Sequence, residues 1–106
     1  MLTQDLFVHH VYFWLEHPNS VEEKAALLEG LKKLSKVTTI KQFHIGTAAP
    51  TNRDVIDTSY ALSWLAIFET AADQDAYQVD PIHLEFVDTC KHLWKKVVVY
   101  DSLGAY

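Results

Sequence analysis

The stretch that decides the fold is FVHHVYFWL, residues 7–15, where aromatic and β-branched side chains follow one another without a break. Side chains of these kinds favour an extended strand. One face of this strand carries Val8, His10, Tyr12 and Trp14, and the other carries His9, Val11, Phe13 and Leu15. A sheet with one face in water would alternate apolar and polar residues. We therefore expect both faces of the strand to be covered.

The elements around this strand follow from capping signals and hydrophobic periodicity. Ser20 and Glu23 form a capping box before an amphipathic helix of roughly four turns. Asp80 and Pro81 are suited to the N-cap and first position of a later helix. Strands are also expected at 38–47, 58–69 and 95–102, helices at 71–78 and 81–93, and a loop at 48–57. The order β-α-β-β-α-β predicts a ferredoxin-like α+β fold, with helices on one face of a four-stranded antiparallel sheet.

The strand at 58–69 is also apolar on both faces, whereas a single helix layer covers only one face of a sheet. The uncovered face would then expose several hundred Å² of apolar surface, which monomers rarely tolerate. A standard interface buries about 800 Å² per partner, which this face can supply. We therefore expect a homodimer that packs sheet to sheet.

Composition limits the classes of function. The 106 residues carry a net charge of −5 and suit a single domain spanning 1–106. Without a basic cluster, binding to nucleic acid or to an anionic membrane surface is not expected. No apolar stretch is long enough to span a bilayer, and the N-terminal MLTQDLF lacks the basic region of a signal peptide. The single cysteine, Cys90, cannot form an internal disulfide, so we expect a cytoplasmic protein.

Several of these segments together are similar to the Dabb family, the stress-responsive A/B barrel domains. The similarity lies in FVHHVYFWL, the pair Ile45-Gly46, AIFETAADQDAYQVDPIHLEF at 66–86, and the closing VVVYDS. It extends from about residue 7 to residue 103. The resemblance implies a dimeric α+β barrel, and most bacterial members of the family have no assigned activity.

A plant branch of that family contains polyketide cyclases, which close a chain by aldol chemistry without metal or cofactor. By resemblance, His10 of the first strand, Tyr77, and His83 of the segment AYQVDPIH would carry such chemistry here. The sequence departs from the family motif at Asp80, where histidine is common. Aspartate still serves as a helix N-cap at that position.

Strand and helix geometry would bring His10 and His83 together if His10 points toward the helices. The expected pocket is then lined by Tyr12, Trp14, Leu28, Leu31, Trp64, Phe68 and Phe86. Two imidazoles and the Tyr77 phenol supply a base, an acid and an oxyanion donor near neutral pH, and an aromatic pocket suits a small oxygenated ligand. If His10 and His83 lie on opposite faces, this arrangement is lost.

The alternatives are a core filled by hydrogen-bonded histidines in a non-enzymatic stress protein, or a cofactor-independent monooxygenase of the antibiotic-biosynthesis type. Six histidines invite a metal, but His9 and His10 point to opposite faces of one strand and cannot chelate the same ion. No metal-binding motif with a recognised spacing accompanies them. We expect no metal and no cofactor.

Overall fold

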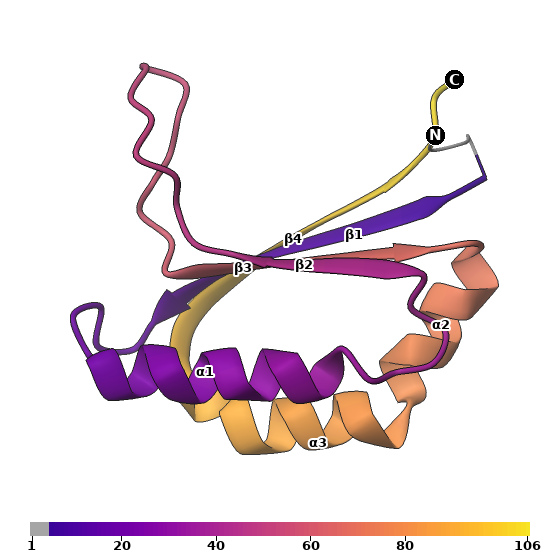
Figure 1. Ribbon diagram of the computed structural model, residues 1–106, viewed down its shortest axis with the longest axis horizontal. Coiled ribbons are helices and arrows are strands. Elements are labelled where there is room, and N and C mark those ends of the chain that lie inside the picture. Colours follow the sequence, from indigo (N-terminus) through magenta and orange to yellow (C-terminus); the bar gives the residue numbers. More distant parts are fainter. Residues whose placement is uncertain (1–4) are drawn as a thin grey trace.

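The chain forms one sheet and one layer of helices, shown in the computed structural model of Figure 1, which describes residues 5–106. In chain order the elements are β1 (Phe7–Leu15), α1 (Val21–Leu34), β2 (Gln42–Gly46), β3 (Leu62–Phe68), α2 (Ala71–Val79), α3 (Pro81–Cys90), the 3₁₀ turn η1 (Lys91–Leu93) and β4 (Trp94–Leu103). The strands pair antiparallel in the order β2-β3-β1-β4. The prediction for MLTQDLF falls partly on residues 1–4, outside those described.

The capping residues act as the sequence predicts. The Ser20 hydroxyl accepts a hydrogen bond from the Glu23 amide at 3.1 Å and starts α1. Thr70 caps α2 in the same way. Asp80 both ends α2 and caps α3, and its carboxylate accepts from the Ile82 amide at 2.8 Å. These caps separate α2 from α3, and all three helices cover one face of the sheet (Figure 1).

Two strands are shorter than expected. The ladder between β2 and β3 ends at the pair Gly46 and Ser63, so residues 58–61 do not pair with β2 and belong to the connection 47–61. The Ala61 amide still donates to the Phe13 carbonyl of β1 at 2.8 Å. The segment 38–41 is a turn leading into β2. The helix expected at 81–93 ends at Cys90, and η1 leads into β4. Apolar side chains alone could not mark these ends, because strands also need hydrogen-bonding partners.

The sheet has a helix face and an open face. On β1 the buried side chains are those of His9, Val11, Phe13 and Leu15, which therefore define the helix face. The open face carries Val8, His10, Tyr12 and Trp14 of β1, Gln42 and His44 of β2, Ser63, Leu65 and Ile67 of β3, and Lys96, Val98 and Tyr100 of β4. No described helix lies over the open face (Figure 1).

The core lies between the helix face and the helices, where Leu27, Leu31 and Leu34 of α1 are almost fully buried. Close packing of α1 on α3 requires Gly30. A Cβ at Gly30 would collide with the Cys90 sulfur and approach the Phe86 ring to 3.3 Å. Cys90 is itself buried, as its helical stripe predicts. Among the described residues, no helix has the length and apolarity needed to cross a membrane.

Candidate functional site

Three titratable side chains meet between the sheet and the helices: His9 of β1, Tyr77 of α2 and His83 in the first turn of α3. The ring centres of His9 and Tyr77 are 5.6 Å apart, and those of Tyr77 and His83 are 4.7 Å apart. Tyr77 therefore lies between the two imidazoles. The Asp80 cap places His83 there, since it starts α3 beside the end of α2.

His9 is oriented by a carboxylate on the neighbouring strand. The register of β1 and β4 sets His9 opposite Asp101, and the His9 Nδ1 lies 2.6 Å from an Asp101 oxygen. Because an ionised carboxylate only accepts, Nδ1 is the donor. The His9 side chain is buried and that of Asp101 is partly exposed, so the pair reaches from the core to the surface.

Tyr77 is almost fully buried, and its hydroxyl oxygen accepts a hydrogen bond from the Trp64 indole nitrogen at 3.1 Å. Burial raises the pKa of Tyr77 far above its ordinary value, and the charge of Asp101 acts in the same direction. The phenol therefore stays protonated at neutral pH. With its oxygen already accepting from Trp64, the O–H remains available as a donor.

His83 is half-buried, and its Nδ1 atom is buried without a hydrogen-bond partner among the described residues. Burial lowers the pKa of His83, and the nearby His9 lowers it further, against smaller opposing effects of the Gln78 backbone and Asp80. The imidazole is therefore neutral at pH 7. A buried polar atom without a partner is costly, and such atoms commonly mark a place where a ligand or water binds.

A cavity of about 210 Å³ joins these groups. Its lining is mostly apolar and consists of His9, Val11, Phe13, Leu34, Trp64, Tyr77, Gln78, His83, Phe86, Val87, Trp94, Val97 and Val99. A cavity of about 150 Å³ is known to hold benzene. This one therefore has room for a single substituted ring, or for a small carbonyl compound of similar size.

The prediction that His10 faces the helices is wrong. His10 pairs with Leu65 and Tyr100 on the open face, so it lies across the sheet from His83. The arrangement of His10 with His83 as a catalytic pair is thereby lost. Its neighbour His9 occupies the place that was expected for His10, because successive residues of a strand point to opposite faces.

Because the face of His10 turns away from the helices, part of the expected lining also lies outside the cavity. Tyr12 and Trp14 share the open face with His10 and line a different hollow there. Trp64 and Phe86 do line the cavity. The remaining three expected residues lie on the helix side but outside the lining: Phe68 packs on Tyr77, Leu31 is fully buried and Leu28 is partly buried.

The sequence reasoning missed His9 and Asp101. One signal was present for His9, because its face continues with Val11, Phe13 and Leu15, which have no polar tip. The other face carries Tyr12 and Trp14, aromatic residues that commonly keep a polar end near water or an interface. Asp101 could be found only through the strand register, which no short motif encodes.

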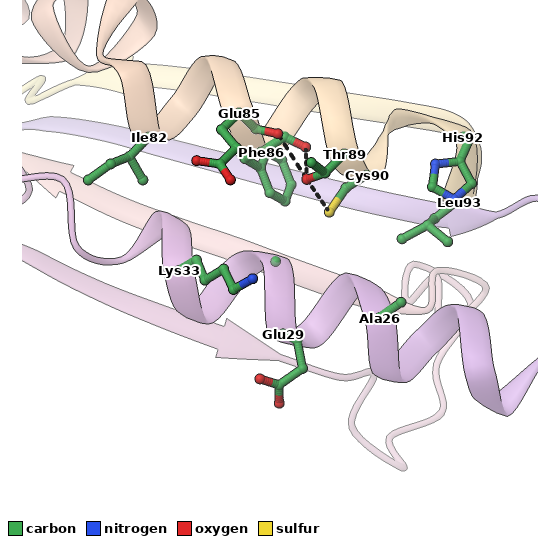
Figure 2. Close-up of a pocket in the computed structure, with 11 residues that line it drawn as sticks. Ala26, Glu29, Lys33, Ile82, Glu85, Phe86, Thr89, Cys90, His92 and Leu93 are labelled. Carbon is green, nitrogen blue, oxygen red and sulfur yellow. Dashed lines mark hydrogen bonds between the residues drawn. The ribbon is translucent and has the colours of Figure 1, made fainter.

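A second hollow, of about 330 Å³, lies between α1 and α3 on the outer side of the helix layer. In Figure 2, Phe86 and Cys90 point from α3 toward α1, and the charged Glu29 and Lys33 stand on α1. The Thr89 hydroxyl bonds back to the Glu85 carbonyl at 2.9 Å. The hollow contains no buried titratable pair, so the His9–Tyr77–His83 cavity remains the candidate site.

Comparison with known proteins agrees with this architecture. The family model described as Stress responsive A/B Barrel Domain matches residues 7–103. The chain belongs to this family. The match to the A/B barrel domain includes all the residues of the candidate site, from His9 to Asp101. No curated protein matched the chain.

Solved structures share the fold of this A/B barrel domain. A Dabb family protein with a ferredoxin-like fold from Mesorhizobium loti is 26% identical, with a TM-score of 0.77 and coverage of 95% of this chain and 98% of that one. A dimeric ferredoxin-like protein of unknown function from Thermobifida fusca is 15% identical, with a TM-score of 0.74 and coverage of 92% and 90%. A hydroxynitrile lyase from Passiflora edulis is 18% identical, with a TM-score of 0.76 and coverage of 95% and 94%. The ferredoxin-like α+β prediction is confirmed.

Proposed function

We propose that this A/B barrel protein binds a small aromatic or carbonyl-containing molecule between sheet and helices and abstracts a proton from it without a cofactor. The observation that carries the proposal is the buried, unpartnered Nδ1 of His83, set beside Tyr77 in an apolar cavity. A ligand group there would satisfy the unpartnered nitrogen. The hydroxynitrile lyase from Passiflora edulis is an enzyme with a similar fold.

Each group has a chemical role in this proposal. His83, neutral because burial lowers its pKa, removes a proton from the carbon next to a carbonyl. Tyr77, kept protonated by burial, donates its O–H to the developing enolate oxygen. His83, now protonated, returns a proton to the product, while His9, held by Asp101, is the second imidazole lining the cavity and offers its unprotonated Nε2 as an acceptor. The pKa order supports these roles, since the base is neutral and the donor remains un-ionised at pH 7.

Exchange of the methyl hydrogens of acetophenone in D₂O, followed by proton NMR, tests the proton abstraction directly. A single general base or acid contributes about 10²–10⁴ in rate, so His83→Ala should lower exchange by that order, and His9→Ala should lower it by less because His9 does not transfer the proton itself. His92→Ala is the matched control, because His92 is exposed and outside the cavity lining. If the acetophenone hydrogens exchange no faster than in buffer, and tryptophan fluorescence does not change on adding acetophenone, the proposal is contradicted. The non-enzymatic alternative is then the one that stands.

The monooxygenase alternative uses the same cavity but consumes oxygen. Hydroquinone is a suitable probe, and an oxygen electrode gives the readout. Oxygen uptake that depends on His83, with no exchange of acetophenone hydrogens, would favour this alternative. The neutral imidazole and protonated phenol fit proton transfer to and from carbon, so acid–base chemistry is our first choice.

We further propose that the working unit is a homodimer joined through the open face, in a reducing cytoplasmic environment. The open face presents Tyr12, Leu65 and Tyr100 with no covering helix, and Tyr100 is 65% exposed. The dimeric Thermobifida fusca relative supports the assembly, and the lone buried Cys90 supports the location. Sedimentation should give about 24 kDa, twice the 12.1 kDa chain.

Leu65→Asp should dissociate this dimer, because a buried unpaired charge costs several kcal/mol. Leu65 lies centrally on the open face, paired with His10 on one side and His44 on the other. Glu29→Ala, on the exposed surface of α1, serves as the control that should leave the dimer intact. A wild-type chain that sediments as a folded monomer at micromolar concentration would contradict the dimer.

A further inference from the structure

The connection between β2 and β3, residues 47–61, forms an arm that leaves the sheet on the side away from the helices (Figure 1). Its base rests on the open face. Tyr60 packs against Tyr12 with ring centres 4.9 Å apart, and the Ser59 hydroxyl accepts from the Trp14 indole nitrogen at 2.9 Å. The arm therefore rises from the surface through which we propose that the dimer forms.

Beyond its base the arm has little support from its own protomer. Within the described residues, segment 48–56 makes two backbone hydrogen bonds, and both are internal: the Thr51 amide to the Ala49 carbonyl at 2.8 Å and the Ile56 amide to the Arg53 carbonyl at 2.9 Å. Val55 is 82% exposed. A loop of this length without secondary structure is uncommon in a compact domain and is usually functional or disordered.

The composition of the arm fits a contact surface better than a solvated linker. It contains no glycine, and apolar residues occur on both of its halves, at Ala48, Ala49, Pro50, Val55 and Ile56. Flexible linkers are instead rich in glycine and serine. The arm therefore presents apolar side chains that its own protomer leaves exposed, at Ala49, Pro50 and Val55, or buries only in part, at Ala48 and Ile56.

The reach of the arm matches a second copy of the chain. About seven residues run from the base to the tip, which at about 3.3 Å per residue is an extended length of roughly 23 Å. Two sheets that pack face to face lie only about 10 Å apart. An arm standing on the open face is therefore long enough to pass the plane of the partner sheet and reach its edge.

We propose that the arm 47–61 of each protomer clasps the edge of the partner's sheet, with Val55 packing against the second copy. The inference rests on the proposed dimer through the open face and extends that interface beyond the sheet. Because a two-fold dimer is reciprocal, two arms hold it, one from each protomer. The interface is then both a sheet-to-sheet contact and a pair of clasps.

Val55→Asp tests the clasp by sedimentation equilibrium. We expect the dimer dissociation constant to rise roughly tenfold or more, as for a charge introduced into an apolar contact. Val21→Asp is the matched control, because Val21 is 77% exposed but starts α1 on the other side of the sheet. A dissociation constant for Val55→Asp equal to that of wild type, while Leu65→Asp dissociates, would overturn the clasp and leave the dimer standing.

A protease supplies a second test on the unaltered chain. Arg53 is the only arginine in the sequence and lies exposed in the arm, so an arginine-specific protease cuts the chain at one place. Cleavage should be slow at concentrations where the dimer forms and fast after dilution below its dissociation constant. In Leu65→Asp it should be fast throughout. Equal rates above and below that constant would overturn the clasp, whereas a wild-type monomer at every concentration would overturn the dimer as well.

Discussion

The Nδ1 atom of His9 lies 2.6 Å from a carboxylate oxygen of Asp101, a residue 92 positions later in the chain. The pair forms because antiparallel β1 and β4 place the two residues directly opposite each other on the helix face. Because an ionised carboxylate only accepts, Nδ1 is the donor, and in a neutral imidazole Nε2 then carries no proton. Asp101 thus selects the tautomer of a histidine that lines the cavity.

Asp101→Ala should remove the preference of His9 for one tautomer. In the wild-type protein at a pH where His9 is neutral, nitrogen-15 NMR should report a proton on Nδ1. The variant should show a mixture of the two tautomers and slower exchange of acetophenone hydrogens, because orienting partners of a histidine typically contribute tenfold or more, about 10–100-fold in metal sites. Asp88→Ala, an exposed change on α3, should alter neither quantity. A wild-type proton on Nε2 would contradict the assignment.

Stability should fall as the solution is acidified, partly through His83. Since the pKa of His83 is lowered in the folded protein, the unfolded chain binds its proton first as the pH drops below about 6.5. The stabilising contribution is therefore complete above that pH and is lost as the pH falls toward the folded pKa. One proton changes the free energy of unfolding by at most about 1.4 kcal/mol per pH unit.

Urea unfolding of wild type and His83→Asn between about pH 7.5 and 5.5, where imidazoles titrate, measures this effect. The variant should show a weaker dependence on pH. His17→Asn provides a control of opposite sign, because hydrogen bonding to Glu23 raises the pKa of the exposed His17. The same slope in wild type and His83→Asn would mean that His83 does not contribute to acid unfolding.

The proposed dimer should weaken at low pH through His10. His10 and His44 flank Leu65 in one row across the open face. Burial, followed by the nearby His44 and His9, lowers the pKa of His10. Sheet-to-sheet packing would bring the rows of both copies into the interface, where protonation adds like charges. The dimer is therefore expected to be tightest above the ordinary imidazole pKa of about 6.5 and to loosen below it.

Sedimentation between about pH 7.5 and 5.5 tests this expectation. Beside the open face, burial raises the pKa of Tyr12 and hydrogen bonds from Ser59 lower the pKa of Asp57, so both groups keep their charge over that range. The dimer dissociation constant of the double variant His10→Gln/His44→Gln should not change with pH. A dissociation constant that varies with pH equally in the double variant and in wild type would assign the effect to other residues.

Gly30→Ala should destabilise the protein although alanine favours helix by about 1 kcal/mol over glycine. The new Cβ collides with the Cys90 sulfur, and overpacking a core typically costs about 1–3 kcal/mol. Urea unfolding should therefore show a net loss. The double variant Gly30→Ala/Cys90→Ala removes the obstructing sulfur and should lose less than the sum of the two single changes. Strict additivity would show that the two sites do not interact.

Most of the fold could be predicted from local signals. The Ser20 capping box and the Asp80-Pro81 pair set helix starts that the structure reproduces, because a cap acts within one turn. The ends of the strands were less predictable. Residues 58–61 carry strand-forming side chains, yet β2 ends at Gly46 and leaves them without a partner in β2, so they belong to the arm.

The candidate site could be predicted only in part. Tyr77 and His83 follow from a local segment, since they lie on either side of one helix cap. The third member depends on which face of β1 turns toward the helices, and both faces of FVHHVYFWL are rich in aromatic residues. Hydropathy therefore does not distinguish His9 from His10, and the two faces differ only in the polar ends of Tyr12 and Trp14 beside His10. Asp101 and Trp64 depend on strand register and on packing between distant elements.

By itself the sequence determined the order of the elements, the helix caps, a sheet that is apolar on both faces, and the presence of a tyrosine and a histidine beside the helix break at Asp80. These properties follow from side-chain types and spacings within a few residues. Only the tertiary structure decided that His9 rather than His10 joins Tyr77 and His83, that Asp101 holds it, and that 47–61 stands away from the helices. The physical reason is that a strand offers two equivalent faces, and the choice between them is made by the packing of helices and the pairing of strands far apart in the chain.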